Sequence, residues 1–323
     1  MSAPTLPTLA DLESAAGIVH AVMPPTPQYA WPLLSARVGA DVWIKHENHS
    51  PVGAFKVRGG IVYLHDLLRD GPRPPGLVTA TRGNHGQSVA FSARRHGLPV
   101  VVVVPHGNDA EKNAAMRALG AEVIEAGDDF QASVEIADAL ATERQWHRLP
   151  SFHPALVRGV GTAGLEFLRA APPLDVVYVP IGLGSGICGM MAARDGLGLA
   201  TRVVGVVSAS APAYARSLAS GRPESHAVTT AIADGMACRT PVPDALTLIS
   251  SGAERVVEVT DAQVMAAMRA IFSDTHNVAE GAGAAALAAI LADRALVAGT
   301  RVGMVLTGGN VDRSVFAGVL GGA

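Results

Sequence analysis

Short runs of β-branched residues alternate with alanine-rich stretches along most of the chain. The runs at 100–104 (VVVVV), 176–179 (VVYV), 203–207 (VVGVV) and 302–306 (VGMVL) contain almost no polar position. Strands with this pattern are buried on both faces, which is typical of a parallel sheet covered by helices. We therefore expect these four segments, together with residues 76–78, to form strands.

The segments between these runs have the polarity pattern of helices. Residues 109–119 begin at an aspartate, which is favoured at helix N-caps, and stop before Gly120. Three further segments share this pattern: 129–146, 261–275 and 283–296. The alternation of strands and helices over the whole chain predicts an α/β fold whose sheets are mostly parallel and covered by helices.

The length of the chain permits two domains. Its 323 residues exceed one typical domain, and a hydrophobic content of 49% with 16% charged residues supports a large buried core. The main breaks in the pattern are GPRPPG at 71–76 and PSFHP at 150–154. We expect a small domain at 52–146, inserted into a larger domain formed by 1–51 and 147–323.

Charge and terminal sequence argue against several classes of protein. A net charge of -3 without a dense basic run disfavours binding to nucleic acid or to anionic membranes. The N-terminal segment lacks the basic region of a signal peptide, and no apolar run approaches the roughly 18 residues of a membrane helix. Two cysteines, Cys188 and Cys238, are too few for a disulfide framework. We expect a cytoplasmic protein.

Lys56 stands in an apolar context, between Phe55 and Val57 in the segment SPVGAFKVRGG. An amine in a desolvated site has a lowered pKa, because its charged form is disfavoured. The unprotonated amine can attack a carbonyl and form a Schiff base. The alternative is a lysine whose stem covers a helix edge while its head group reaches water.

Two glycine-rich loops follow predicted strands. TATRGNHGQS, at 79–88, offers several backbone N–H groups to an anion such as a carboxylate, although an ordinary turn also favours Asn and Gly. PIGLGSGICG, at 180–189, lets the backbone approach a ligand closely and directs a helix N-terminus at a phosphate.

Three glycines of the second loop, 184, 186 and 189, also match the G-x-G-x-x-G dinucleotide fingerprint. That motif requires an acidic residue at the end of the next strand, where it binds a ribose. Here the next strand is followed by SAS at 208–210, which contains no carboxylate. We therefore expect a phosphate site, and an NAD-dependent oxidoreductase is disfavoured.

Thr307 follows the last predicted strand, in LTGGNVD at 306–312. A hydroxyl at this point would lie at the carboxyl edge of the sheet, where α/β proteins bind ligands, although a helix-cap role is equally compatible. The histidines form no metal-binding motif, and we interpret His96, His106 and His147 as surface or cap residues.

An amine in apolar surroundings, an anion loop, a phosphate loop and a hydroxyl at a strand end resemble the site of the fold type II pyridoxal-phosphate enzymes. The resemblance is to the branch of threonine/serine dehydratases and serine racemase. Seven motifs occur in the family's order over nearly the whole chain: AFKVRGG, TRGNHGQ, HPALVRGVGTAGLEF, GLGSGICG, IADGMA, NVAEGAG and LTGGNVD. Each motif alone is modest, but seven in order are specific. The resemblance implies two lobes and a pyridoxal 5'-phosphate cofactor.

The resemblance also implies roles for individual residues. Lys56 corresponds to the Schiff-base lysine, which also takes the α-proton of the substrate. Asn84 is expected to bond the phenolic oxygen of the cofactor, and Thr307 its pyridine nitrogen. The expected cofactor-binding positions are Phe55, Lys56, Asn84, Gly182, Leu183, Gly184, Ser185, Gly186, Gly235, Glu280 and Thr307. The expected substrate-binding positions are Thr81, Arg82, Gly83, Asn84, His85 and His153.

Two departures from the family pattern refine the prediction. Arg82 replaces a serine that serves the opposite face of the substrate in serine racemase-like members, and an arginine is a poor proton donor or acceptor, so racemisation is doubtful. Arg82 would then contact an acidic or otherwise distinctive substrate, or point to solvent. Ser208 and Tyr214 stand near the positions at which metal-dependent relatives carry acids, so we expect no divalent metal.

A hydroxyl at the pyridine nitrogen makes the cofactor ring a weaker electron sink than a carboxylate would, which favours prompt loss of a β-leaving group. We expect a lyase that eliminates water from a β-hydroxy-α-amino acid of the threonine or serine type, giving a 2-oxo acid and ammonia. The alternatives are an amino-acid racemase, a dehydratase for a bulkier or acidic β-hydroxy amino acid, and a non-catalytic small-molecule sensor. A homodimer is expected from the resemblance alone.

Overall fold

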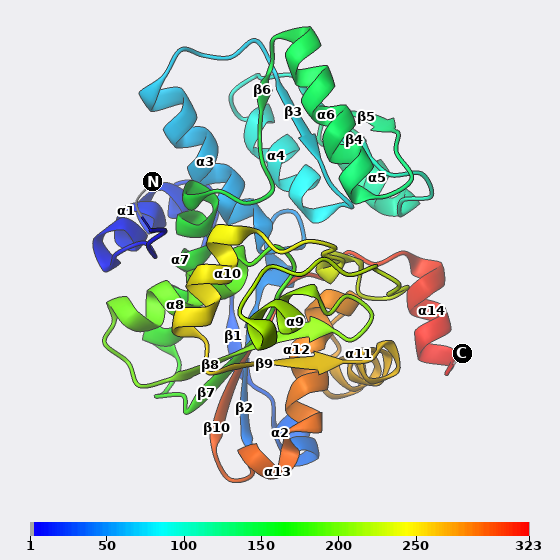
Figure 1. The fold of residues 1–323 in the computed structure, drawn as a ribbon. Coiled ribbons are helices and arrows are strands. Elements are labelled where there is room, and N and C mark those ends of the chain that lie inside the picture. The colour runs from blue at the N-terminus through cyan, green and yellow to red at the C-terminus, as the bar shows by residue number, and fades with distance from the viewer. Residues whose placement is uncertain (1–2, 323) are drawn as a thin grey trace.

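The computed structural model describes residues 3–322, which form two sheets with helices on both faces of each (Figure 1). Within these residues the larger sheet has six strands in the order β1-β2-β10-β7-β8-β9, and the smaller has four in the order β5-β4-β3-β6. Every strand pair is parallel except β1 with β2. The predicted α/β fold with mostly parallel, helix-covered sheets is confirmed.

The strands are β1 (Gln28–Ala30), β2 (Asp41–His46), β3 (Leu77–Ala80), β4 (Val100–Val104), β5 (Glu122–Glu125), β6 (His147–Arg148), β7 (Val176–Pro180), β8 (Arg202–Ser208), β9 (Arg255–Val259) and β10 (Arg301–Leu306). The helices are α1 (Leu9–His20), α2 (Pro32–Val38), α3 (Lys56–Asp70), α4 (Asn84–Arg94), α5 (Ala110–Ala118), α6 (Phe130–Arg144), α7 (Pro154–Ala170), α8 (Ser185–Gly196), α9 (Ala213–Ser220), α10 (Pro243–Gly252), α11 (Asp261–Thr275), α12 (Gly281–Ala292), α13 (Arg294–Val297) and α14 (Arg313–Gly321), with short 3₁₀ turns η1 (Glu47–His49) and η2 (Asp234–Met236).

Strand β4 shows why the valine runs predicted a doubly covered sheet. Val100, Val102 and Val104 pack into a core shared with α3, α4 and α5, whereas Val101 and Val103 pack against α6 on the other face. Successive side chains of a strand point to opposite faces, so a strand buried on both faces has no position for a polar residue. The larger sheet is built in the same way, with α7, α8 and α10 on one face and α2, α11 and α12 on the other.

Several elements were not expected from the sequence. Strand β2 reads DVWIKH, and its polar residues concealed it, yet Lys45 and His46 are buried because each has a partner. The Lys45 Nζ lies 2.6 Å from the Glu166 Oε2, and the Trp31 indole donates to His46 at 3.0 Å. Strands β1, β5, β6 and β9 are short or partly exposed, which weakens their pattern. Strand β6 pairs with β3, so the smaller sheet runs two residues beyond 146, the end expected for the small domain.

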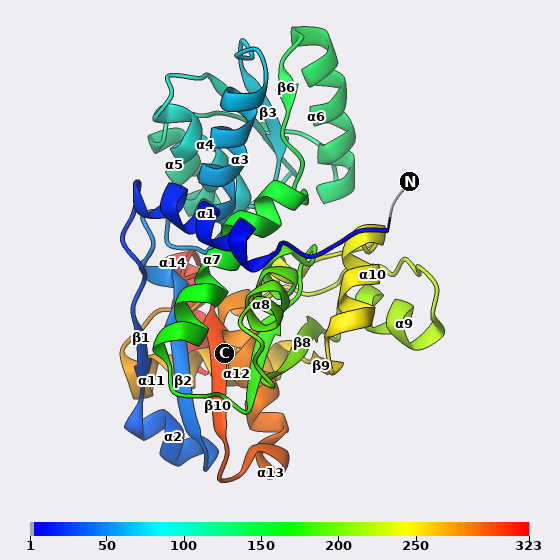
Figure 2. The ribbon, with the colours of Figure 1, turned by 90° about the vertical axis from the view of Figure 1, so that its left-hand side faces the viewer.

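Helices α3 and α7 lie between the two sheets, and helix α1 packs against both α3 and α7 (Figures 1 and 2). Strands β3, β7 and β10 direct their carboxyl ends toward the space between the sheets, and the loops that follow them line one cavity. This is the edge at which open α/β sheets bind their ligands. Within residues 3–322, no helix combines the length and apolar character needed to cross a membrane.

Candidate active site

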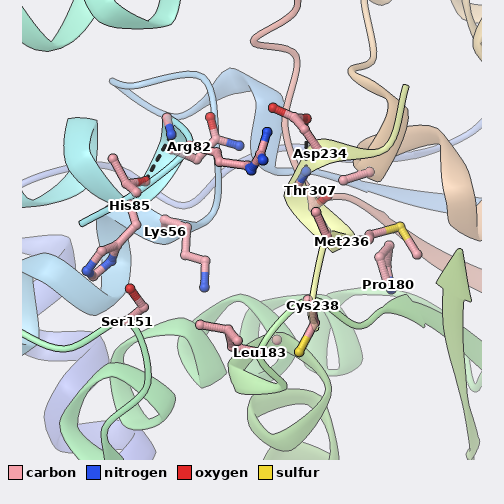
Figure 3. Close-up of a pocket in the computed structure, with 18 of the residues that line it drawn as sticks. Lys56, Arg82, His85, Ser151, Pro180, Leu183, Asp234, Met236, Cys238 and Thr307 are labelled. Atoms are coloured by element: carbon pink, nitrogen blue, oxygen red, sulfur yellow. Dashed lines mark hydrogen bonds between the residues drawn. The ribbon is translucent and has the colours of Figure 1, made fainter. Parts of the chain in front are cut away.

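One cavity between the two sheets brings together every predicted cofactor- and substrate-binding position except His153 (Figure 3). Its empty space is about 900 Å³, part of it open to solvent, which is adequate for a small-molecule ligand. The predicted positions that line it are Phe55, Lys56, Thr81, Arg82, Gly83, Asn84, His85, Gly182, Leu183, Gly184, Ser185, Gly186, Gly235, Glu280 and Thr307. Segments that lie far apart in the sequence thus converge on one site.

Lys56 is the first residue of α3, and its amine points into the cavity (Figure 3). The Nζ donates to the Ser185 Oγ at 3.1 Å and lies 5.0 Å from the centroid of the Phe55 ring. No carboxylate of the described residues pairs with it, and burial lowers the pKa of Lys56 to about 8. A larger fraction of this amine is therefore unprotonated near neutral pH than of an ordinary lysine, as nucleophilic attack requires.

The chain contains three lysines, and the other two are ion-paired. Lys45 lies 2.6 Å from Glu166, and Lys112 lies 2.7 Å from Asp234 and 3.5 Å from Glu280. Lys56 is therefore the one lysine among the described residues whose amine lacks a neighbouring carboxylate. This contrast supports the prediction that Lys56 is the reactive amine.

The segment before Lys56 is tied to the segment after β10. The Phe55 N–H donates to the carbonyl of Thr307 at 2.9 Å, and the Gly309 N–H donates to the carbonyl of Gly53 at 3.0 Å. Ala54 and Gly308 form an isolated antiparallel bridge. These bonds fix the positions of the Lys56 amine and the Thr307 hydroxyl relative to each other, although the two residues lie far apart in sequence.

The loop at 182–186 forms a concave surface, and at two of its positions the backbone requires glycine. A Cβ on Gly182 would lie 2.5 Å from the carbonyl oxygen of Gly235, and Gly184 has φ = +99°, which disfavours other residues. Helix α8 begins at Ser185, so its first N–H groups face the cavity, as in phosphate sites. Tyr214 supports the loop from behind, because its hydroxyl donates to the Leu183 carbonyl at 3.0 Å and accepts from Val242.

A chain of polar contacts crosses the cavity wall from the smaller sheet to the larger. Asn84 donates to Glu280 at 2.6 Å and accepts from Asn310 at 2.8 Å. Burial raises the pKa of Glu280 to about 7, an effect that the nearby Lys112 ammonium partly opposes. Lys112, on α5, also donates to Asp234 in η2. No pattern in the sequence indicated Lys112 or Asp234 as paired groups, because they meet only through the tertiary fold.

The loop after β3 contributes both bonded and free polar groups. The Thr81 hydroxyl accepts from the Gly83 N–H at 2.9 Å, and Gly83 has φ = +153°. Burial, reinforced by the charge of Lys56, lowers the pKa of His85 to about 3, so this imidazole is neutral. The buried His85 Nε2 has no hydrogen-bond partner among the described residues, which leaves it available to a ligand.

His153 does not line the cavity, and its predicted substrate-binding role stays a prediction. Its Nδ1 accepts from the Ala155 N–H at 3.1 Å, which caps α7, and its ring lies edge-on to Tyr63. Ser151, two residues earlier, does line the cavity. The lining residues that the sequence did not single out are Lys112, Phe130, Pro180, Asp234, Met236, Ala237, Cys238 and Ala282.

The predicted metal-free character was based on Ser208 and Tyr214, and Tyr214 is occupied in supporting the phosphate loop. Within residues 3–322, no group of three or more His, Cys, Asp or Glu residues is arranged to hold a metal ion. The absence of a divalent cation in the enzyme stays a prediction.

These residues fit pyridoxal 5'-phosphate. The glycine loop and the α8 N-terminus suit a phosphate, the unpaired Lys56 amine suits an aldehyde, and the Thr307 hydroxyl makes no hydrogen bond to another described residue and is free to bond a ring nitrogen. The buried, unpartnered His85 nitrogen indicates that the cavity wall is completed by a polar ligand.

Comparison with known proteins agrees with this fit. A family model described as "Pyridoxal-phosphate dependent enzyme" matches residues 21–308. The L-threonine ammonia-lyase of Thermotoga maritima is 32% identical over 306 residues, which cover 94% of this chain and 76% of that protein. The crystal structure of a threonine deaminase from "T.th." superposes with a TM-score of 0.87 at 31% identity, covering 95% of this chain and 99% of that one.

A serine racemase is also similar. The maize enzyme superposes with a TM-score of 0.89 at 25% identity, covering 97% of this chain and 96% of that one. The predicted family and cofactor are thereby confirmed. The chain belongs to the family of pyridoxal-phosphate-dependent enzymes and has the fold type II architecture of the threonine ammonia-lyases.

Proposed function

We propose that the protein is a pyridoxal-phosphate-dependent lyase that eliminates water from a β-hydroxy-α-amino acid, giving a 2-oxo acid and ammonia. The carrying observation is the unpaired Lys56 amine, which lies in one cavity with a phosphate loop and a hydroxyl at the end of β10. Relatives named threonine ammonia-lyase and threonine deaminase support the same reaction class, which the sequence analysis predicted.

When bound, the cofactor supplies an aldehyde that condenses with amines and a ring that withdraws electrons from the substrate Cα. Residues 182–186 and the N-terminus of α8 would hold its phosphate, and Phe55 would lie beside its ring. Asn84 would bond its phenolic oxygen, and Thr307 its ring nitrogen. A threonine hydroxyl does not hold that nitrogen protonated as a carboxylate does, so the site is suited to rapid loss of a leaving group.

Lys56 would act twice. Its amine would hold the cofactor covalently, and the same nitrogen, once free, would take the α-proton of the substrate. The Ser185 hydroxyl, 3.1 Å from the Lys56 Nζ, keeps the amine directed at the cavity. The loop at Thr81–His85 would bind the substrate carboxylate through N–H groups and the Thr81 hydroxyl, and the neutral His85 adds no charge to that site.

The test is a screen of β-hydroxy amino acids with the holoenzyme, measuring 2-oxo acid and ammonia, with Lys56→Ala as the inactive control. Stoichiometric release of both products is expected. Chiral analysis of the remaining substrate separates a racemase, which would invert it without releasing ammonia. A protein that binds amino acids, releases nothing and inverts nothing would be a sensor, and the proposal would be wrong.

We also propose four finer properties. The chain divides into a small domain at 52–146 and a large domain formed by 1–51 and 147–323. It forms a homodimer, for which the exposed Tyr29 of the edge strand β1 and Leu33 of α2 provide an apolar surface. It acts in the cytoplasm and needs no divalent metal. Light scattering of the purified protein tests the dimer, and assays in excess chelator test the last property.

A further inference from the structure

Arg82 is a charged residue of the cavity that has no role in the mechanism above and forms no ion pair with another described residue. It lies between β3 and α4, one residue before the Gly83-Asn84-His85 loop, and Figure 3 shows its guanidinium extending into the cavity on the side of Asp234. Its Nε is buried without a hydrogen-bond partner, and no described carboxylate forms an ion pair with its guanidinium. Arg82 as a whole is partly exposed, but a buried guanidinium nitrogen is normally bonded to an acceptor.

The nearby acidic groups are already committed to another cation. Asp234 accepts from the Lys112 Nζ at 2.7 Å, and Glu280 lies 3.5 Å from the same nitrogen. The Lys112 side chain is only 5% exposed and that of Glu280 3%, so this cation is largely shielded from solvent. If either carboxylate turned from Lys112 to Arg82, the buried Lys112 would lose one of its partners, which is unfavourable.

Arg82 also occupies a distinctive place. A second cavity adjoins the first and is lined by residues of α6, the segment 148–152 and the loop at 227–242. Both cavities share Arg82, Phe130, Ser151, Leu183, Ala237 and Cys238, so these residues mark the junction between them. Among the described residues, Arg82 is the one charged group at the junction, and its neighbours there are mostly apolar.

Other arginines of the second cavity have carboxylate partners. Arg148 lies 2.6 Å from Asp138, and Arg239 lies 2.8 Å from Asp129. These pairs show that the described chain supplies a carboxylate to each of the two arginines at the outer wall and none to Arg82. A carboxylate partner for Arg82 would therefore have to come from a ligand.

We propose that Arg82 binds an acidic group on the substrate side chain, so that the preferred substrate is a β-hydroxy-α-amino dicarboxylic acid such as 3-hydroxyaspartate. This inference rests on the proposed β-elimination. The α-carboxylate would bind to the loop at 83–85, and the second carboxylate would reach the adjacent guanidinium, which can bond both its oxygens. The net reaction converts the amino acid to a 2-oxo dicarboxylic acid and ammonia: the Cα–H and Cβ–O bonds break, water leaves, and the released enamine takes up water as ammonia departs.

The experiment compares kcat/KM of the holoenzyme on threo- and erythro-3-hydroxyaspartate with that on L-threonine, for the wild type and R82Q. For the wild type, kcat/KM on one hydroxyaspartate isomer should exceed kcat/KM on L-threonine by about tenfold or more. In R82Q the ratio of kcat/KM on that isomer to kcat/KM on L-threonine should fall by about 10- to 100-fold. The fall should come mainly from a higher KM for hydroxyaspartate, as expected for loss of a charged hydrogen bond. The matched control R148Q removes a paired arginine from the adjoining cavity and should leave the ratio unchanged.

Binding of an unreactive probe gives a second readout. Succinate, with two carboxylates, should bind the wild-type holoenzyme at least about tenfold more tightly than butyrate, and R82Q should abolish that difference. A wild type that prefers threonine, or an R82Q variant that loses both substrates equally, would overturn the proposal, the latter because Arg82 would then bind the α-carboxylate. If no amino acid releases ammonia, the proposed function fails, and the succinate measurement still decides the role of Arg82.

Discussion

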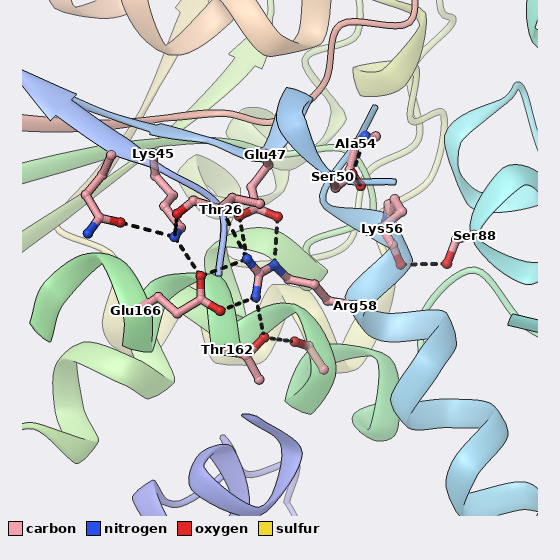
Figure 4. A network of polar contacts seen from close by, with 12 residues as sticks. Thr26, Lys45, Glu47, Ser50, Ala54, Lys56, Arg58, Ser88, Thr162 and Glu166 are labelled. Atoms are coloured by element: carbon pink, nitrogen blue, oxygen red, sulfur yellow. Dashed lines mark hydrogen bonds and ion pairs between the residues drawn. The ribbon is translucent and has the colours of Figure 1, made fainter. Parts of the chain in front are cut away.

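Lys56 and Arg58 lie two residues apart on the first turn of α3, yet Arg58 is paired with carboxylates and Lys56 is not (Figure 4). The Arg58 guanidinium is fully buried and bonds Glu47 at 2.7 and 2.9 Å and Glu166 at 2.6 and 2.8 Å. It also donates to Thr162 at 3.0 Å. Lys56 faces the cavity, and within residues 3–322 its amine has only the Ser185 hydroxyl as a hydrogen-bond partner.

The pKa values follow from these surroundings. Burial opposes the charge of Arg58, but the two carboxylates outweigh it and raise the pKa of Arg58 above its ordinary value. Burial likewise opposes the charge of Glu166, but Arg58 and Lys45 lower the pKa of Glu166 to about 2. For Lys56 burial acts alone, and its pKa falls to about 8. The carboxylates thus keep Arg58 charged, whereas their absence around Lys56 lets its amine lose a proton near neutral pH.

The largest effect should come from removing the amine. Lys56→Ala is expected to lower turnover by at least about 10³-fold, because the residue is both the cofactor attachment and the base. Its unfolding midpoint in urea should not fall appreciably, since no ion pair is lost. Steady-state rates and urea titration of the same preparations provide both numbers, and a variant that keeps a tenth of the activity would refute the role of Lys56.

Arg58 should show the reverse pattern. Arg58→Met leaves Glu47 and Glu166 buried without their main partner, which is expected to reduce the free energy of unfolding by about 3–5 kcal/mol. The triple variant with Glu47→Gln and Glu166→Gln should recover part of that loss, because no unpaired charge then remains from these two residues. If Arg58→Met unfolds at the wild-type urea concentration, the network does not stabilise the fold.

The pH dependence of the free energy of unfolding of the apoprotein should distinguish Lys56 from Arg58. Lys56 has a pKa of about 8 when folded against an ordinary value of 10.5, so the folded state binds fewer protons between these pH values. By linkage, apoprotein stability should therefore rise between about pH 8 and pH 10.5, by at most about 3 kcal/mol. Lys56→Met should remove this rise, whereas Arg58 stays protonated throughout and adds no slope. A wild-type stability that falls over this range by the same amount as in Lys56→Met would contradict the lowered pKa.

A neutral group in the cavity should give the smallest effect. Thr307→Val keeps the shape of the side chain and removes one hydroxyl, so turnover is expected to fall about 5- to 10-fold, in line with the loss of one hydrogen bond. The absorbance of the bound cofactor should shift, because the ring nitrogen loses its partner. An unchanged rate and spectrum would show that Thr307 does not contact the ring.

Much of the site was accessible from the sequence because it is built from short motifs at strand ends. Asn84, the glycine loop and Thr307 each follow a predicted strand, and in a parallel sheet those ends meet at one edge. Lys56 was indicated by its apolar neighbours Phe55 and Val57. No local motif indicated that Lys112 is part of the site. Its partners Asp234 and Glu280 are more than a hundred residues away in the sequence and lie on the side of the cavity formed by the larger sheet. Such pairing exists only in the folded chain.

The errors also have physical causes. The polar strand β2 was overlooked because Lys45 and His46 suggest exposure, and only the buried partners explain their burial. The motif of His153 could not show that its ring caps α7 and packs on Tyr63, which places it outside the cavity. The helix expected at 283–296 ends at Ala292, where the chain turns into the short helix α13.

The most direct test is reduction of the holoprotein with borohydride, followed by peptide mapping by mass spectrometry. The chain offers three lysines, Lys45, Lys56 and Lys112, and we predict that the reduced cofactor is found on Lys56 alone, in near-stoichiometric amount. Labelling of Lys45 or Lys112, or no covalent label at all in a protein that binds the cofactor, would contradict the account.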